Sequence, residues 1–227
     1  SLGKGDIREP FIEVTYPNGS STTDMVFDRA EIIQGKEEYD TLPGSYDDNG
    51  EVEQLVIYLK DRNYNLTLEL HYYVYEKCDI ITRSAKLVNS GNESVRLERL
   101  MSMQLDLNES DYELSFFNGA WAREMNRSRI PIRAGKYVNE SVTGTSSNRA
   151  NPFFMIGRSS TTEDYGECYG FNLIYSGNHY EAAQVNSYGK LRLVSGINPA
   201  TFSYIIEAGK CFEAPEAVLT YSYKGYN

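Results

Sequence analysis

The chain contains few of the residues on which disulfide frameworks, metal sites and acid–base catalysis depend. Its 227 residues include three cysteines, two histidines and one tryptophan. The cysteine count is odd, the spacings of Cys78, Cys168 and Cys211 are wide, and no C-x-x-C motif occurs, which argues against a disulfide framework and against a zinc site. We therefore expect free, buried thiols in a reducing compartment, and no metal.

Long apolar segments are missing as well. No run approaches the roughly 20 residues that a membrane-spanning helix needs, and no signal-peptide pattern opens the chain. Together with the free thiols, these absences predict a cytoplasmic protein that has no membrane partner.

The sequence signatures of catalysis are also absent. No G-x-S-x-G elbow lies near His71 or His179, and there is no H-E-x-x-H pair or glycine-rich loop that would cradle a phosphate. The acidic runs around Glu37 and Asp47 accompany turn residues, and we expect them on the solvated surface, where nothing raises a carboxyl pKa for acid catalysis. We predict no cofactor and no catalytic residue in this chain, and interpret it as a binding or scaffolding module.

Positive charge is scarce. The chain has 22 Lys and Arg against 32 Asp and Glu, a net charge of −10 and a pI near 4.8. Such a surface repels nucleic acid and anionic lipid, so we expect neither as a partner. Only the window Arg123–Arg133 is locally basic, with four arginines opposed by Glu124 alone. Two interpretations stay open for this window: ion pairs with the acidic remainder, which we favour, or an anion site.

Alternation of apolar and polar residues is what the sequence has in abundance. It runs strictly through Leu66–Tyr75 and continues for longer in Val95–Leu107. A period of two over ten or more residues excludes an amphipathic helix and is typical of β-strands. Arg99 is the exception on the apolar side of the second segment, and we expect it to lie near a sheet edge or to pair with a carboxylate.

These segments predict the fold class. No window of 10–15 residues shows a convincing 3.6-residue period, and the best helical candidate, Met125–Arg129, is poor. The gaps are short and rich in Gly, Asn and Pro, which indicates antiparallel sheets packed face to face. Strands this long favour large curved sheets over a small immunoglobulin-sized sandwich. We predict an all-β fold, a large antiparallel β-sandwich, with residues 1–227 forming a single domain.

The single tryptophan lies in a stretch that does not alternate cleanly, Asn118–Glu124. There Trp121 is followed closely by Arg123 and Glu124, so a large ring is joined to a cation and an anion. An aromatic face beside charged groups on an irregular connection is one way to hold a sugar, and also one way to pin a loop. Both interpretations stay open on the residues alone.

Several blocks, in this order, resemble the N-terminal domain of bacterial family-36 glycoside hydrolases, the retaining α-galactosidases. The likeness covers nearly the whole chain, and its specificity comes from order and spacing and not from any one motif. The blocks that carry it are Gly5–Pro10, Ile80–Ser84, the strand at Met101-Ser102, Gly119–Glu124, Asn151–Phe153, Gly166–Phe171, Tyr175–Asn178, Gly196–Pro199, and Pro215-Glu216 followed by Tyr221-Ser222.

The resemblance implies a β-supersandwich of the galactose-mutarotase-like kind. It also implies that the chain lacks a few N-terminal strands and a following catalytic (β/α)8 barrel, which would be its partner within the parent protein. The family's two catalytic aspartates belong to that barrel and match no position here, so we expect this chain to be inactive alone.

The same resemblance implies substrates and assembly. The parent enzyme would hydrolyse terminal α-galactosyl residues from raffinose-type oligosaccharides and form a homo-oligomer. Trp121 would lie against the C–H face of the sugar in a neighbouring subunit's pocket, with Arg123 or Glu124 anchoring the loop, so we take Trp121 and Arg123 as candidate substrate-binding residues. If flanking parts are missing, we also expect an exposed apolar or aromatic patch and some self-association.

An alternative function is a free-standing, lectin-like sandwich that binds glycans for their own sake. A lectin needs a complete site within one chain, so binding of galactose or raffinose by the isolated chain separates the two hypotheses. A purely structural surface domain is disfavoured, because no export signal opens the chain.

Overall fold

The computed structural model describes residues 2–227, which form strands and two short 3-10 helices. The helices are η1 (Glu76–Cys78) and η2 (Pro199–Thr201). The strands are β1 (Ile12–Thr15), β2 (Met25–Gln34), β3 (Glu53–Asp61), β4 (Leu66–Tyr75), β5 (Ile80–Asn89), β6 (Val95–Leu107), β7 (Glu113–Ala120), β8 (Arg123–Pro131), β9 (Gly135–Glu140), β10 (Ala150–Gly157), β11 (Cys168–Ile174), β12 (His179–Val185), β13 (Leu191–Ile197), β14 (Tyr204–Ile206), β15 (Cys211–Glu213) and β16 (Glu216–Ser222).

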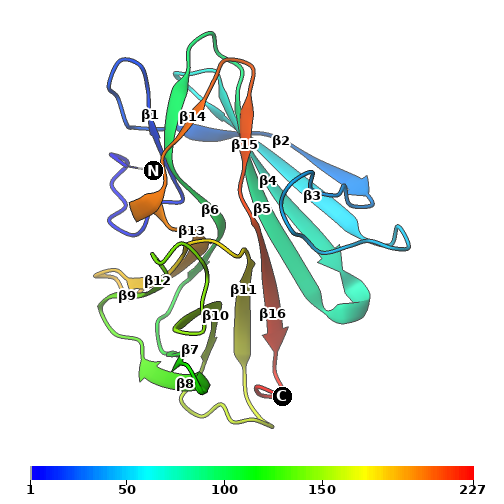
Figure 1. Ribbon diagram of the computed structural model, residues 1–227, viewed down its shortest axis with the longest axis vertical. Coiled ribbons are helices and arrows are strands. Elements are labelled where there is room, and N and C mark those ends of the chain that lie inside the picture. The colour runs from blue at the N-terminus through cyan, green and yellow to red at the C-terminus, as the bar shows by residue number, and fades with distance from the viewer. Residues whose placement is uncertain (1) are drawn as a thin grey trace.

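The strands form two antiparallel sheets that face each other (Figure 1). The smaller sheet has the order β1-β6-β13-β12-β9, with β14 also paired to β6. The larger sheet has ten strands in the order β2-β3-β4-β5-β16-β11-β10-β7-β8, with β15 paired to β5. The predicted all-β class and large antiparallel sandwich are confirmed.

Long alternating segments give long strands that serve both halves of the core. The two segments predicted from alternation are β4 and β6, with the predicted ends. Strand β6 contributes Leu97 and Leu100 to one apolar cluster, against β4 and β5, and Met103 to a second cluster, against β7, β10, β11 and β16. One continuous strand therefore joins the two halves of the sandwich.

Arg99 lies on the face of β6 opposite Leu97 and Leu100, because a register shift in the pairing with β1 adds one residue to β6 at Glu98. Its guanidinium pairs with Glu9 and, at 3.1 Å, with Glu13, and it lies over the ring of Tyr180. The expected pairing with a carboxylate is confirmed, but the predicted position on the apolar face is wrong, because the bulge turns Arg99 away from the core side.

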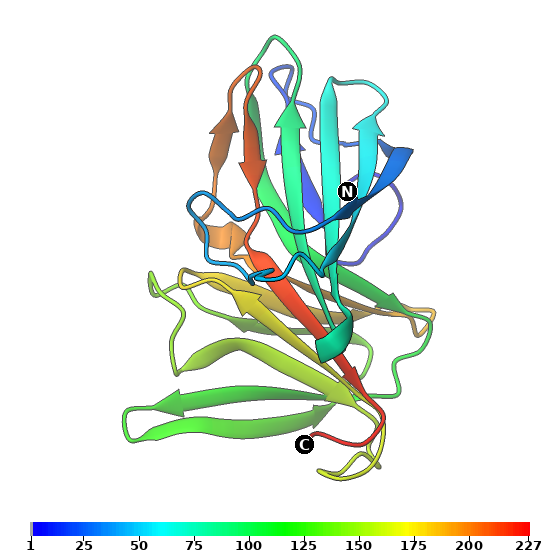
Figure 2. The same cartoon turned by 90° about the vertical axis from the view of Figure 1, so that its right-hand side faces the viewer.

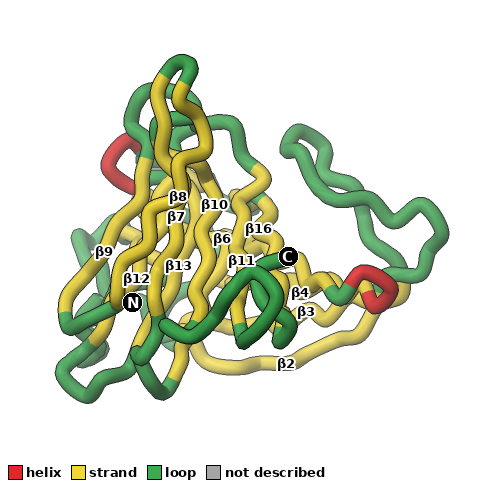
Figure 3. Tube along the Cα trace, turned by 90° about the horizontal axis from the view of Figure 1, so that it is seen from below, coloured by secondary structure: helices red, strands yellow, loops and turns green. Residues whose placement is uncertain are grey.

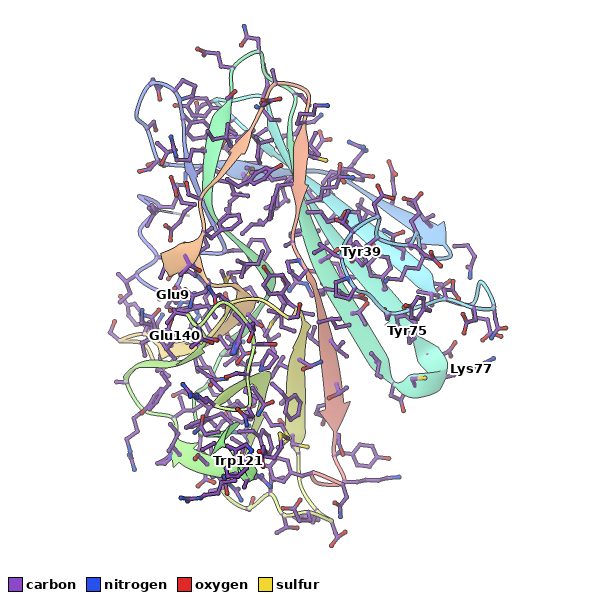
Figure 4. The ribbon with its side chains drawn as sticks, in the orientation of Figure 1. Glu9, Tyr39, Tyr75, Lys77, Trp121 and Glu140 are labelled. Carbon is purple, nitrogen blue, oxygen red and sulfur yellow. The ribbon has the colours of Figure 1, made fainter. Side chains whose placement is uncertain are left out.

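A buried carboxylate fixes the long connection between β2 and β3 over the outer face of the larger sheet. Glu216 on β16 accepts hydrogen bonds from the Ser45 backbone N–H (2.8 Å) and hydroxyl (2.6 Å) and pairs with Lys36 at 3.1 Å. Figure 2 shows this connection crossing in front of the strands, and Tyr39 and Tyr75, labelled in Figure 4, lie on this side of the molecule. The outer face of β3–β5 is therefore covered from within the chain.

Met125–Arg129, the poor helical candidate, is part of β8, which pairs in register with β7. One further expectation needs correction. All three thiols are free, as expected, but only Cys168 is buried, while Cys78 and Cys211 are exposed. Within residues 2–227, no helix has both the length and the apolar character needed to cross a membrane.

Candidate functional site

Trp121 lies at the tip of the hairpin formed by β7 and β8. Two residues, Trp121 and Ala122, join the strands, and Ala122 adopts φ = 59°, as a tight turn requires. The hairpin forms a long two-stranded arm in Figure 2, its tip projects at the top of Figure 3, and Figure 4 labels Trp121. The stretch that interrupts the alternation is therefore a turn with a bulge and not a long loop.

The tip is held by its own polar groups. The Glu124 carboxylate accepts a hydrogen bond from the Ala122 N–H at 2.9 Å, and the Asn126 amide donates to the Arg123 carbonyl. Asn126 also pairs with Asn118 across the strands, beside a register shift that ends at Ala120. These hydrogen bonds fix the backbone of the turn, and none of them involves the Trp121 side chain.

Close to its tip, the arm is packed against residues 141–149. A Cβ atom added at Gly119, two residues before Trp121, would lie 2.7 Å from the Asn148 carbonyl oxygen and 2.8 Å from the Arg123 carbonyl oxygen. Only glycine permits this approach. Two residues further from the tip, the Phe117 ring stacks on Phe153 with centroids 5.4 Å apart. The arm is therefore held close to the turn that carries Trp121.

The side chains at the tip point to solvent. Trp121 is 90% exposed, so it does not pin the hairpin against any other part of residues 2–227. Arg123 is also exposed, and its guanidinium forms no hydrogen bond or ion pair within the described chain. A rigid arm thus presents an unpaired ring and an unpaired cation two residues apart.

The remaining arginines of the basic window are paired. Arg127 pairs with Glu163 at 2.9 Å and Arg129 with Glu113, and both guanidinium groups lie over the Tyr226 ring. The favoured interpretation, ion pairing with the acidic remainder, is confirmed for these two residues. The structure does not gather them with Arg123 into one anion site.

His179 is a buried structural residue. Its Nε2 donates to the Ala150 carbonyl at 2.9 Å, and burial lowers its pKa, so the ring is neutral and Nδ1 is an acceptor. The Glu181 carboxyl lies 3.8 Å from Nδ1 and accepts a 2.6 Å hydrogen bond from the Asn139 amide. Complete burial raises the pKa of Glu181 well above its ordinary range, which favours the protonated form of this carboxyl.

Glu181 is a shielded acid that the sequence did not single out. Glycosidic acids need a dry carboxyl, but they also need space beside it for a sugar. The void next to Glu181 measures about 10 Å³, which admits at most one water molecule. The Glu181 carboxyl therefore has no space beside it in which a sugar could bind.

A cavity of about 630 Å³ lies beside the 36–42 segment and is lined by a second candidate acid, Glu213. Burial raises the pKa of Glu213, whereas Glu37, Glu38 and Asp40 are exposed, as predicted for the acidic run. His71 also lines this cavity, where its Nδ1 bonds the Gln54 amide at 2.8 Å. The rings of Tyr73, Tyr175, Phe202, Tyr204 and Phe212 complete the lining. The cavity thus offers one shielded acid and several aromatic faces.

Metal ligation has no support among residues 2–227, where no group of three or more His, Cys, Asp or Glu side chains converges.

One face of the larger sheet is left bare. Along β4, the inward-facing residues change from 2% exposed at Leu68 to 39% at Val74. Cross-strand neighbours on this face continue the bare surface: Ile81 on β5 lies opposite Val74, and Ile32 on β2, 78% exposed, lies opposite Leu55. The expected exposed apolar patch is therefore present, where the larger sheet extends beyond the smaller one.

Comparison with known proteins gives one consistent result. Residues 1–207 match the family model described as the glycosyl hydrolase family 36 N-terminal domain. The chain is 38% identical to the α-galactosidase AgaA of Geobacillus stearothermophilus over 228 residues, which is all of this chain and 31% of that protein. It is 35% identical to the bifunctional α-galactosidase/sucrose kinase AgaSK of Mediterraneibacter gnavus, over 99% of this chain and 24% of that protein.

Solved structures agree. The crystal structure of the α-galactosidase from Lactobacillus brevis superimposes with a TM-score of 0.97 at 40% identity, over 99% of this chain and 30% of that one. Variants of AgaA, solved in complex with stachyose and with raffinose, superimpose with TM-scores of 0.96 and 0.97. The chain thus spans about a third or less of the length of the relatives it matches.

Proposed function

The chain belongs to the glycosyl hydrolase family 36 N-terminal domain family, and from that membership we propose that it is the non-catalytic N-terminal domain of a retaining α-galactosidase. The observation that carries the proposal is the coverage. The whole chain aligns with relatives named α-galactosidases, but only with 31% of the length of AgaA. We assign the hydrolytic chemistry, a carboxylate nucleophile and a carboxylic acid/base, to the larger C-terminal part.

The distribution of shielded acids supports this division of labour. A retaining glycosidase places two carboxyl groups about 5–5.5 Å apart across a cleft. Glu181 is dry but has no room beside it, and Glu213 is the single shielded acid of its cavity. We propose that the partner carboxylates lie in a following barrel, as the family resemblance implies.

The bare face of the larger sheet supports a scaffolding role. Ile32, Val74 and Ile81 expose apolar surface on a regular sheet, and contiguous patches of this kind mark docking sites. We propose that this face receives the catalytic barrel or a neighbouring subunit of a homo-oligomer. We also propose a cytoplasmic location, because the three thiols are free.

The rigid arm supports a role at the substrate pocket. An exposed indole ring can lie against the C–H face of a galactosyl group, and the unpaired Arg123 guanidinium can bond its hydroxyls. AgaA has been solved with raffinose and with stachyose, and we propose raffinose-type α-galactosides as the substrates here. Trp121 and Arg123 would then line a pocket completed by another part of the enzyme.

The test uses an aryl α-galactoside. We expect no turnover by the 227-residue chain, and measurable turnover would refute the assignment of chemistry to the C-terminal part. In the full-length enzyme, we expect Trp121→Ala to lower kcat/KM by roughly five- to tenfold, about 1–1.4 kcal/mol of transition-state binding. Tyr188→Ala removes an equally exposed ring outside the arm and should leave kcat/KM unchanged. If both variants behave alike, Trp121 has no place in the pocket.

The lectin-like alternative has one specific observation in its favour, the aromatic rings around the 630 Å³ cavity. Titration calorimetry of the isolated chain with galactose and raffinose separates it from the first proposal. Sub-millimolar binding that is lost in Tyr204→Ala favours the lectin, and the absence of binding favours the non-catalytic domain.

A further inference from the structure

A second pocket opens between the two sheets, where the smaller sheet ends and the bare face begins. Its volume is about 440 Å³, within the range of sites for small molecules. Both sheets contribute to its walls, and its deeper part is apolar, with Phe11, Leu59 and Leu70. The charged residues that line it are Lys4, Asp6, Arg8, Asp24, Arg83 and Arg192.

Arg83 is the unusual member of this set. It is 5% exposed, and its Nη1 donates a 2.7 Å hydrogen bond to the Gln104 carbonyl, while the guanidinium lies 4.5 Å from the Tyr72 ring centroid. Its Nε is buried without an acceptor, and Nη2 forms no hydrogen bond within residues 2–227. Burial lowers the pKa of this group, but an arginine side chain keeps its proton even so.

Three other arginines have side chains that are 10–12% exposed, and all three are neutralised. Arg99 pairs with Glu9 and Glu13. Arg8 pairs with Asp6 at 2.9 Å, and Arg192 pairs with Asp106 at 2.7 Å and Asp6 at 2.9 Å. Arg83 has no carboxylate partner among the described residues. A buried charge without a counter-charge is strongly unfavourable, and a buried polar group left unsatisfied in a native fold calls for an explanation such as a bound ion.

The charge around the pocket points to the same explanation. Three of the four cationic side chains along its walls are paired: Lys4 with Asp24, and Arg8 and Arg192 with Asp6 and Asp106. The positive charge that no carboxylate neutralises is therefore that of Arg83. The unsatisfied edge of Arg83, Nε with Nη2, is the side of a guanidinium that bonds two oxygen atoms of one group at once.

We propose that this pocket binds a small oxyanion, a carboxylate or phosphate group, through the Nε–Nη2 edge of Arg83. The anion supplies the missing counter-charge and the missing acceptors, while the apolar walls contact the remainder of the molecule that carries it. The site is distinct from the Trp121 arm and requires no catalytic activity, so it can be tested on this chain alone.

The experiment measures thermal unfolding of the 227-residue chain in inorganic phosphate, in citrate, and in sodium chloride at matched ionic strength. At about ten times the dissociation constant, binding to the folded state should raise Tm by roughly 3–6 °C over chloride. Titration calorimetry of the same samples gives the stoichiometry, with one site per chain expected. A response to phosphate alone identifies that group as the ligand class, and a response to citrate alone identifies the carboxylate.

Three variants make the assignment specific. Arg83→Met should abolish the anion-dependent rise and leave Tm in chloride unchanged or higher, since it removes a buried unpaired charge. Arg83→Lys keeps the charge but not the fork of donors and should weaken binding about tenfold. Arg133→Met, at an exposed arginine, is the matched control and should respond as the wild type does. Equal Tm values for the wild type in all three salts, or a full response in Arg83→Met, would overturn the proposal.

Discussion

The inner face of the larger sheet is covered over one half and bare over the other. Beneath the smaller sheet, Phe171 and Leu173 on β11 are buried in the core. Toward β2, cross-strand neighbours of the same apolar kind are open to solvent, with Ile32 and Ile81 as the clearest cases. The alternation in sequence is the same in both halves. Alternation therefore encodes which residues share a face, whereas the partner of that face has to come from elsewhere.

The largest expected effect comes from truncating one side chain in each half. Leu173→Ala should lower the free energy of unfolding of the chain by about 2–5 kcal/mol, because a cavity forms in packed core. Ile32→Ala should lower it by less than about 1 kcal/mol, because little buried area is lost. Urea denaturation of the two variants gives both values. Similar losses would show that the two halves are equally covered and would end the distinction.

The second expected effect is on the pH dependence of stability, and it tests whether water is excluded from the covered half, where Glu181 is buried. Because burial raises its pKa, Glu181 keeps its proton in the folded chain up to a higher pH than in the unfolded chain, which loses it once the pH exceeds about 5. Between that pH and the raised folded pKa, the folded state binds more protons, so its stability should fall by up to about 1.4 kcal/mol per pH unit. His179, whose pKa is lowered, acts in the opposite sense: its contribution to stability is lost as the pH falls below the ordinary histidine range.

Glu181→Gln separates the two titrations. The glutamine keeps the acceptor for Asn139 and cannot ionise, so the variant should become more stable than the wild type as pH rises from 5 to 8. The measurement is the free energy of unfolding at several pH values. Glu53→Gln, at an exposed strand position, should follow the wild-type curve. A constant difference between Glu181→Gln and the wild type would mean that Glu181 is not protonated in the folded state.

Most of the fold could be predicted from local pattern. Strands β4 and β6 have the predicted ends, because side chains on a strand alternate between two environments. In β6 two register shifts break this alternation, so that Leu97, Leu100 and Met103 enter the core while Arg99 lies on the other face. The gradient along β4, from Leu68 to Val74, was not predictable, since it depends on where a distant strand stops.

The candidate site was predictable only in part. Trp121 was singled out by its neighbours, but the tight turn was hidden, because Ala122 and Met125 adopt positive φ in place of the usual glycine or asparagine. Arg83 and Glu181 sit within alternating segments, where their charges give no sign of burial. Only the packing of β5 on β6, and of β12 between its neighbours, removes water from them. Such buried charged groups can be identified only from a structure, in which their hydrogen-bond partners can be counted.

Substitutions in the bare half are expected to have the smallest effect on the free energy of unfolding. They are also expected to have the largest effect on self-association. A double variant, Ile32→Thr with Ile81→Thr, keeps two β-branched side chains in their strands and makes the face polar. We expect the free energy of unfolding to change by less than about 1 kcal/mol, while self-association of the isolated chain, measured by analytical ultracentrifugation, weakens at least tenfold. Tyr188→Thr removes exposed aromatic surface outside this face and should leave association unchanged. If the double variant associates as the wild type does, the bare half is not the surface by which this sandwich meets its partner, and the covering element must be sought at the arm that carries Trp121.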